Sequence, residues 1–106
     1  MAETPPQLSL VVEQHDHWTI VRLAGELDLV TAPAFADALR KANSEIVVDF
    51  ADLTFLDAAG VGVLAQASER AKRDDDNLVV VNAGPLAQRV FEVTGLDHLL
   101  SGTDAP

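Results

Sequence analysis

Three carboxylates are the side chains of this sequence with the clearest capacity for chemistry. Glu26 and Asp28 follow an apolar run and a glycine, and Asp57 directly precedes a run with helical spacing. If the fold brings them together, such carboxylates suit Mg²⁺ binding or acid–base work. The alternative is structural: Asp57 caps a helix, while Glu26 and Asp28 solvate a loop. No phosphate-binding motif accompanies them, because Gly60-Val61-Gly62 lacks the lysine of a P-loop and the third glycine of a dinucleotide fingerprint.

Nucleophilic catalysis has little support in the sequence. The chain has no cysteine, and its three histidines, His15, His17 and His98, lie in a turn-like segment or near the end of the chain, away from Asp57. The pattern around His15 and His17 is typical of an exposed turn rather than a metal site, because tight-turn side chains diverge and no further ligand set is evident. The acidic run 74–76 is likewise typical of a solvated loop. We therefore expect no catalytic residue, no metal and no cofactor.

The composition limits the classes of partner. With 7 basic and 17 acidic residues the net charge is −10, which argues against binding to nucleic acid or to an anionic membrane surface. A protein with a basic patch is the natural complement. The 106 residues suffice for one domain. No signal peptide or membrane-spanning run is evident, and the absence of cysteine fits a reducing compartment, so a cytoplasmic location is expected.

The segment 46–73 organises the rest of the chain. Its first part, 46–50, is rich in β-branched residues, as expected of a strand that is covered on both faces. The stretch 52–57 is predicted to be a loop with two carboxylates, and from about Ala58 the apolar residues follow the period of a helix. Asp57 stands at the predicted N-cap, where its carboxylate can accept from free amides at the positive end of the helix dipole.

The remaining segments predict a small single-domain α/β fold. The predicted strands are 8–13, 18–23, 46–50 and 78–81, and the predicted helices are 31–43, 58–73 and 85–95, between terminal tails at 1–7 and 101–106. Thr31 is expected to cap the first helix, and Leu86, Val90 and Val93 are expected to face the core from the last. The order ββαβαβα implies parallel strand pairs beside an antiparallel hairpin, with the helices packed mainly on one side of a mixed sheet.

The central helix has an outer face without charge near its start. At 100° per residue, the face opposite the core contains Ala59, Gly62, Val63, Gln66 and Arg70. A solvated face would usually carry Glu or Lys there, and each glycine costs the helix about 1 kcal/mol. We infer that something approaches this backbone closely. An Ala- and Gly-rich helix without any partner is the alternative.

Four motifs carry a resemblance to a known family. They are Gly25-Glu26-Leu27-Asp28, the run Asp52-Leu53-Thr54-Phe55-Leu56-Asp57-Ala58-Ala59-Gly60-Val61-Gly62-Val63-Leu64, Gly84-Pro85, and Thr94-Gly95-Leu96. Together they resemble the STAS domain, and within it the bacterial anti-sigma factor antagonists of the sporulation and general-stress type. The resemblance covers residues 8–100 and implies a mixed sheet of four to five strands flanked by helices.

The resemblance also implies a mechanism of partner switching in the cytoplasm. In such proteins the unmodified antagonist binds an anti-sigma factor, which is a serine kinase of the GHKL type, and so frees the sigma factor for transcription. The kinase then phosphorylates a serine at the start of the central helix, and this phosphorylation ends binding.

The phosphoacceptor position departs from the family pattern. That pattern is Asp-Ser-Ser-Gly or similar, with the second hydroxyl as acceptor, whereas this chain has Asp57-Ala58-Ala59-Gly60. Ala59 carries only a methyl group, so no phosphoryl group can be attached there. The nearest hydroxyls, on Thr54 and Ser68, lie several residues away. Either this branch has lost the switch naturally, or the residue was engineered.

The sequence therefore predicts a protein-binding module and not an enzyme. It would be an anti-sigma factor antagonist-like domain, a monomer or weak dimer, that binds a GHKL-type anti-sigma factor and is not switched at Ala59. The predicted contact residues are Glu26, Asp28, Thr31, Asp57, Ala58, Ala59, Gly62, Val63 and Gln66. Two alternatives remain open: a module that senses a nucleotide or small molecule, with the three carboxylates around a metal, and a structural subunit of a signalling assembly.

Overall fold

The predicted order of elements is confirmed. A computed structural model describes residues 7–42 and 45–101 of the chain. The elements are β1 Leu8–Gln14, β2 Trp18–Leu27, α1 Ala32–Lys41, β3 Glu45–Leu56, α2 Ala58–Arg73, β4 Leu78–Val81, α3 Pro85–Thr94 and a 3₁₀ turn, η1, at Asp97–Leu99. The tails predicted at 1–7 and 101–106 lie outside the described residues, apart from Gln7 and Ser101.

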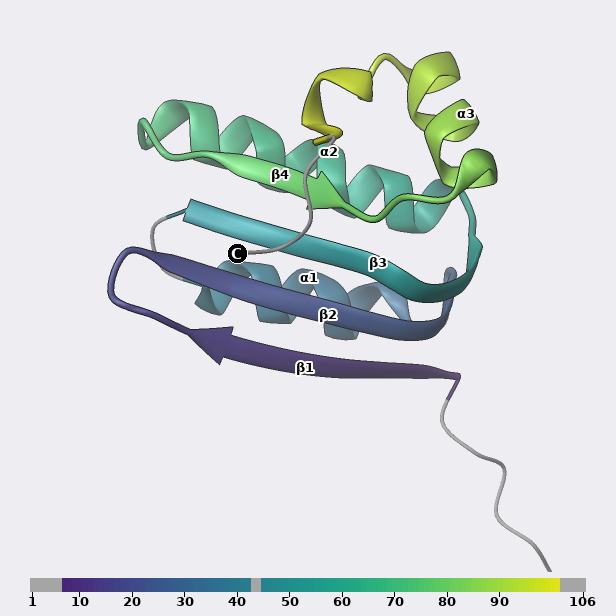
Figure 1. Ribbon diagram of the computed structural model, residues 1–106, viewed down its shortest axis with the longest axis horizontal. Helices are drawn as coiled ribbons and strands as arrows, with labels where there is room; N and C mark the ends of the chain where they lie inside the picture. Colours follow the sequence, from purple (N-terminus) through teal and green to yellow (C-terminus); the bar gives the residue numbers. More distant parts are fainter. Residues whose placement is uncertain (1–6, 43–44, 102–106) are drawn as a thin grey trace, which may run out of the picture.

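The four strands form one mixed sheet in the order β1-β2-β3-β4. The hairpin pair β1–β2 is antiparallel, and the pairs β2–β3 and β3–β4 are parallel. In Figure 1 both α1 and α2 lie behind the sheet, whereas α3 stands beyond its β4 edge. The predicted fold class, a small α/β domain with a mixed sheet of four to five strands and helices mainly on one side, is confirmed, and the sheet has four strands.

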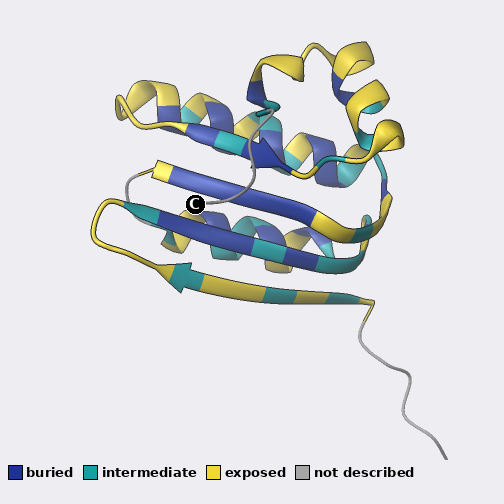
Figure 2. Cartoon of the chain, in the orientation of Figure 1, coloured by how far each residue is buried: buried dark blue, intermediate teal, exposed yellow. Residues whose placement is uncertain are grey.

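The main core lies between the sheet and the two helices that cover it (Figure 2). Phe35 of α1 and Leu64 of α2 are fully buried against the strands, and Phe91 of α3 meets Phe50 edge-on with ring centroids 6.0 Å apart. Consecutive strand residues point to opposite faces, so Ile20, Val47 and Val81 form a smaller buried cluster on the other face of the sheet. The larger cluster fixes the ends of β2 and β3 against the start of α2.

The loop predicted at 52–57 is wrong, because β3 continues to Leu56. Its second half pairs only with β2, in a parallel register that joins Ala24 to Asp52 and Leu27 to Leu56, with two shifts on the way. This half of β3 is largely exposed because β4 ends opposite Asp49. The carboxylates of Asp52 and Asp57 led to the prediction of a loop, but backbone pairing with β2 holds this largely exposed segment extended.

The inward orientation predicted for α3 is correct only in part. Val90 is half-buried against the core, but the side chains of Leu86 and Val93 are 67% and 78% exposed. Phe91 is the one buried residue of this helix. The physical reason is position: α3 lies past the edge of the sheet (Figure 1) and therefore contacts the core along a narrow strip.

Candidate functional site

The site predicted around Asp57 is built where β2 and β3 end side by side. Leu27 and Leu56 are partners in the parallel register, and the amide of Asp57 donates to the carbonyl of Leu27 at 3.2 Å. The loop that follows β2 and the helix that follows β3 therefore start together. The carboxyl ends of parallel strands are the usual place for binding sites in α/β folds.

Asp57 is the N-cap of α2, as predicted. It has extended backbone, and its Oδ1 accepts from the amides of Ala59 at 2.9 Å and Gly60 at 3.4 Å. These amides have no partner inside the helix, and a carboxylate also suits the positive end of the helix dipole. Asp57 thus has a structural role whatever else it does.

Replacing Asp57 with alanine should lower the free energy of unfolding by about 1 kcal/mol, because the two amides lose their acceptor. Asparagine is as good a cap as aspartate, so Asp57→Asn should keep most of this stability. Urea unfolding of the three proteins measures the difference. Equal losses in both variants would show that the charge, and not the hydrogen bond, is what stabilises the helix start.

Asp28 and Thr31 organise the β2–α1 loop. The Asp28 Oδ1 accepts from the amides of Val30 and Thr31, both at 3.0 Å. The Thr31 hydroxyl donates to the Glu26 carbonyl at 2.8 Å and accepts from the Asp28 amide at 2.9 Å. Thr31 occupies the N-cap position of α1, but its side chain makes no cap hydrogen bond. The predicted side-chain cap is therefore wrong, because the loop uses that hydroxyl.

The carboxylates do not assemble into a metal site. Asp28 faces the amides of its own loop, Asp57 faces those of α2, and Glu26 is exposed. Across residues 7–42 and 45–101, no group of three or more His, Asp or Glu side chains is placed to hold a metal ion. The structural interpretation of Asp28 and Asp57 accounts for their positions.

The sequence pointed to the loop 25–31 as a docking segment but did not single out two of its side chains that the structure makes prominent. Leu29 and Val30, at the tip of the β2–α1 loop, are each 76% exposed. The amide of Val30 donates to the Asp28 Oδ1, so the loop that carries this pair is held in place. The sequence did contain a signal for this exposed pair. Two apolar residues stand between Asp28 and Thr31, whereas such turns usually carry polar residues.

The outer face of α2 is close to the predicted one, with one correction. Ala58, Gly62 and Gln66 are exposed and Ala59 is half-buried. Val63, predicted to lie opposite the core, is also half-buried but packs against the core cluster. The helix therefore offers a narrow, uncharged ridge at Ala58, Gly62 and Gln66.

The packing of the monomer explains one of the two glycines of this helix but not the other. A Cβ on Gly60 would stand 2.6 Å from Leu27 Cγ and 2.9 Å from Leu56 Cδ1, so the packing of the β2 and β3 ends requires glycine. A Cβ on Gly62 would meet nothing within 4 Å. Nothing among the described residues therefore requires glycine at position 62, although alanine would favour the helix by about 1 kcal/mol.

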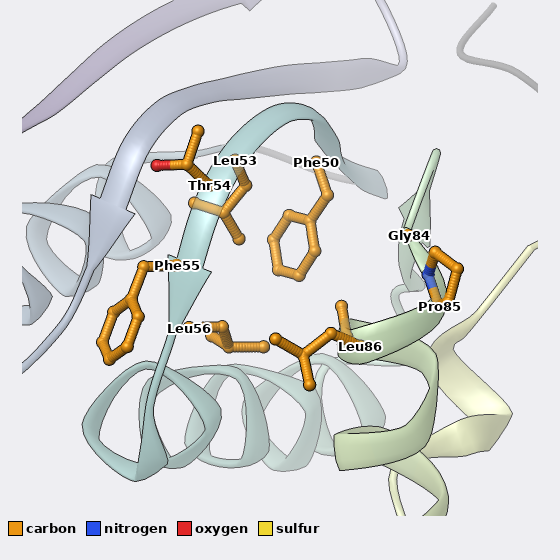
Figure 3. Close-up of a pocket in the computed structure, with 9 residues that line it drawn as sticks. Phe50, Leu53, Thr54, Phe55, Leu56, Gly84, Pro85 and Leu86 are labelled. Carbon is orange, nitrogen blue, oxygen red and sulfur yellow. The ribbon is translucent and has the colours of Figure 1, made fainter.

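Two apolar hollows border this surface. A groove of about 380 Å³ separates α2 from α3 and is lined by Leu56, Asp57, Ala58, Val61, Gly62, Ala65, Val90, Thr94 and Leu96. A smaller pocket of about 140 Å³ lies between the end of β3 and the start of α3; Figure 3 shows Phe50, Leu56 and Leu86 around it. The groove continues the Ala58–Gly62 ridge, so the apolar surface extends from α2 toward α3.

The hydroxyls nearest to Ala59 in sequence do not replace the missing acceptor. Ser68 is buried on the inner side of α2. Thr54 is exposed, but it belongs to β3 and lines the smaller pocket. Neither takes the place of a side chain at position 59.

Comparison with known proteins agrees with this geometry. The sequence profile of the family described as "Mlab, STAS domain" matches residues 10–101. The chain belongs to the STAS domain family. The resemblance noted from the motifs is thereby confirmed.

Several proteins similar to this STAS domain have a named role. The anti-sigma-B factor antagonist of Staphylococcus epidermidis is 26% identical over 97 residues, which cover 88% of this chain and 90% of that protein. The crystal structure of an anti-sigma factor antagonist from Mycobacterium paratuberculosis is 31% identical, with a TM-score of 0.80 over 96% of this chain and 92% of that one. The phosphorylated form of the Bacillus cell fate determinant SpoIIAA has a TM-score of 0.75 at 23% identity, over 92% of each chain, and shares the fold.

Among the described residues of this STAS domain, none of the helices has the length and apolar character needed to cross a bilayer.

Proposed function

We propose that this STAS domain is an anti-sigma factor antagonist that binds a GHKL-type serine-kinase anti-sigma factor in the cytoplasm and performs no catalysis itself. The observation that carries the proposal is Gly62, an exposed helix glycine that the monomer does not need. A close backbone approach by a partner explains it. The role of the relatives named above supports the identity of that partner.

The proposed contact surface has two parts. One is the loop tip with Leu29 and Val30, and the other is the ridge of Ala58, Gly62 and Gln66 on α2. Exposed apolar side chains that gather on one surface often mark a site of protein–protein contact. Glu26 and the net charge of −10 favour a basic partner surface and speed the encounter.

In this proposal the contact is not switched at position 59. A phosphoserine there would add nearly two negative charges beside Asp57, in a surface that binding must desolvate. Ala59 adds no charge beside Asp57, so binding would persist whatever the activity of the kinase. The domain would then act as a constitutive antagonist.

The test is a calorimetric titration of the full chain with the anti-sigma factors of its source organism, with and without ATP. We expect one of them to bind, with an affinity that prior incubation with ATP leaves unchanged and with no phosphate at 58–59 by mass spectrometry. Ala59→Ser is the matched variant: it should gain one phosphate and then lose affinity.

Two results would contradict the proposal. If the chain bound none of the kinase-type anti-sigma factors, the proposed identity of the partner would be wrong. If the unaltered chain were stoichiometrically phosphorylated at Thr54 or Ser68 and then lost binding, it would not be a constitutive antagonist. A nucleotide sensor would instead show chemical-shift changes near Asp57 on addition of GTP and Mg²⁺ alone.

A further inference from the structure

The strand β1 is an edge strand whose outer side is open among the described residues. It pairs with β2 and with no other described strand, and in Figure 1 it forms the edge opposite β4. Its register with β2 runs without interruption from Leu8 to Gln14, and the strand contains no lysine and no proline. Natural edge strands usually carry a bulge, a proline or a lysine that prevents further pairing. Val11 and Val12 are 51% and 45% exposed, so the edge is also apolar.

The hydrogen bonds of the hairpin show which backbone groups are free. The amide of His15 donates to the carbonyl of Trp18 at 2.8 Å, and the amide of Glu26 donates to the carbonyl of Gln7 at 2.7 Å. Hydrogen-bonded and non-bonded pairs alternate along an antiparallel ladder. The odd-numbered residues of β1 therefore bond to β2, whereas Leu8, Leu10, Val12 and Gln14 direct their N–H and C=O groups outward.

We propose that this edge binds a second copy of the same chain, with the two β1 strands antiparallel about a twofold axis at Val11. That axis places Leu10 opposite Val12 and Leu8 opposite Gln14 of the other copy. Each outward-facing residue then meets another outward-facing residue, so the backbone groups match along the whole strand. An axis between two residues would pair outward with inward groups and lose this match.

The side chains also fit such a pairing. On the helix side of the sheet, Leu10 and Val12 would lie beside the same residues of the other copy. On the other side Val11 would face Val11, and Ser9 would face Glu13, so no like charges stand directly opposite each other. The edge therefore matches itself in apolar character and places no like charges directly opposite each other.

A groove beside the edge offers space for the second copy. It has a volume of about 370 Å³ and lies between β1 and α1, lined by Leu10, Val12, Gln14, Ala34, Asp37, Ala38 and Lys41. Its charged members, Asp37 and Lys41, are paired with each other at 2.9 Å. The incoming Leu10 and Val12 would thus enter a groove whose charges are already neutralised. Strand addition combines backbone hydrogen bonds with pockets for alternate side chains in the same way.

The dimer would leave the proposed anti-sigma surface open. That surface lies beyond the carboxyl ends of β2 and β3. The proposed dimer contact instead runs along the outer side of β1, the strand at the edge of the sheet (Figure 1). A twofold axis through Val11 reverses the strand direction, so the two copies would present these surfaces at opposite ends of one eight-stranded sheet. The assembly would be a bivalent binder.

The test compares two single variants, each of which introduces a lysine on the same face of β1. In sedimentation equilibrium of the full chain at physiological salt, Val11→Lys should weaken dimerisation roughly tenfold or more, because two lysines meet on the axis. Ser9→Lys should strengthen it about two- to tenfold, because each lysine then faces Glu13. Both variants change the net charge equally, so a general charge effect cannot separate them. Thermal unfolding at low concentration checks that both remain folded.

A second measurement needs no variant. Amide exchange of the unaltered chain should slow at Leu10 and Val12 as the protein concentration rises, whereas the amides of α2 should not change. A chain that stays monomeric at all concentrations would overturn the proposal. So would a dimer that Ser9→Lys weakens as much as Val11→Lys does, or protection of the edge that appears only when an anti-sigma factor is added.

Discussion

Replacing Gly62 with alanine should make the free domain more stable and its complex with an anti-sigma factor weaker. The new methyl group meets nothing within 4 Å in the monomer, so the helix gains about 0.5–1 kcal/mol from the better helix former. In the complex the same methyl would stand where the partner approaches the backbone. Overpacking by one carbon costs about 1–3 kcal/mol, which is roughly a five- to 150-fold loss of affinity. Urea unfolding and calorimetric titration measure the two effects separately.

The opposite signs make this prediction specific. Most changes that weaken binding through misfolding also lower stability, and Gly62→Ala should not. Glu69→Ala is the matched control, because it introduces the same residue at another exposed position of α2, further from Asp57. It should leave the affinity within about twofold, since exposed substitutions away from a contact have small effects. Unchanged binding by Gly62→Ala would place the partner elsewhere on the domain.

The order of elements was predictable because local patterns determine it. The helical spacing after Asp57, the proline that begins α3 and the glycine that follows it are signals within single elements, and each coincides with a helix end in the structure. The second half of β3 was not predictable in this way. Its residues, Ala51 to Leu56, are mostly exposed and include two polar side chains, and they are extended because the end of β2 lies beside them. Such pairing is a property of two distant segments.

The candidate site was predictable to the same extent. The N-cap role of Asp57 follows from its place before a helical pattern, and the structure confirms it. The exposure of Leu29 and Val30 depends on a turn held by Asp28, and the inward contact of Val63 depends on how α2 rests on the core. The face of a helix can be derived from its period, but the rotation of that helix against its neighbours cannot.

The two glycines of α2 show this limit most clearly. Both follow Asp57 closely and look equivalent in the sequence. In the structure Gly60 lies against the buried Leu27, while Gly62 faces open space. One glycine belongs to the packing of the fold and the other is left to be explained by function. The sequence alone suggested a close approach to both.

Replacing Gly60 with alanine should therefore destabilise the domain. The added Cβ would lie 2.6 Å from Leu27 Cγ and 2.8 Å from Leu27 Cδ2, well inside contact distance. Leu27 is fully buried and cannot turn away without moving its neighbours. We expect a net loss of about 1–2 kcal/mol, as overpacking of about 1–3 kcal/mol exceeds the gain in helix propensity. The melting temperature should fall by about 4–8 °C for each kcal/mol.

A double-mutant cycle with Leu27→Ala identifies the clash behind this loss. Leu27→Ala alone should cost about 2–5 kcal/mol, because it leaves a cavity beside Gly60. In the double variant the methyl group of residue 60 would enter that cavity, so the combined loss should be smaller than the sum by about 1 kcal/mol or more. Additive losses would mean that Gly60→Ala acts through the helix backbone and not through Leu27. Because the Leu27 carbonyl accepts from the Asp57 amide, relief of the clash should also restore the geometry at the start of α2.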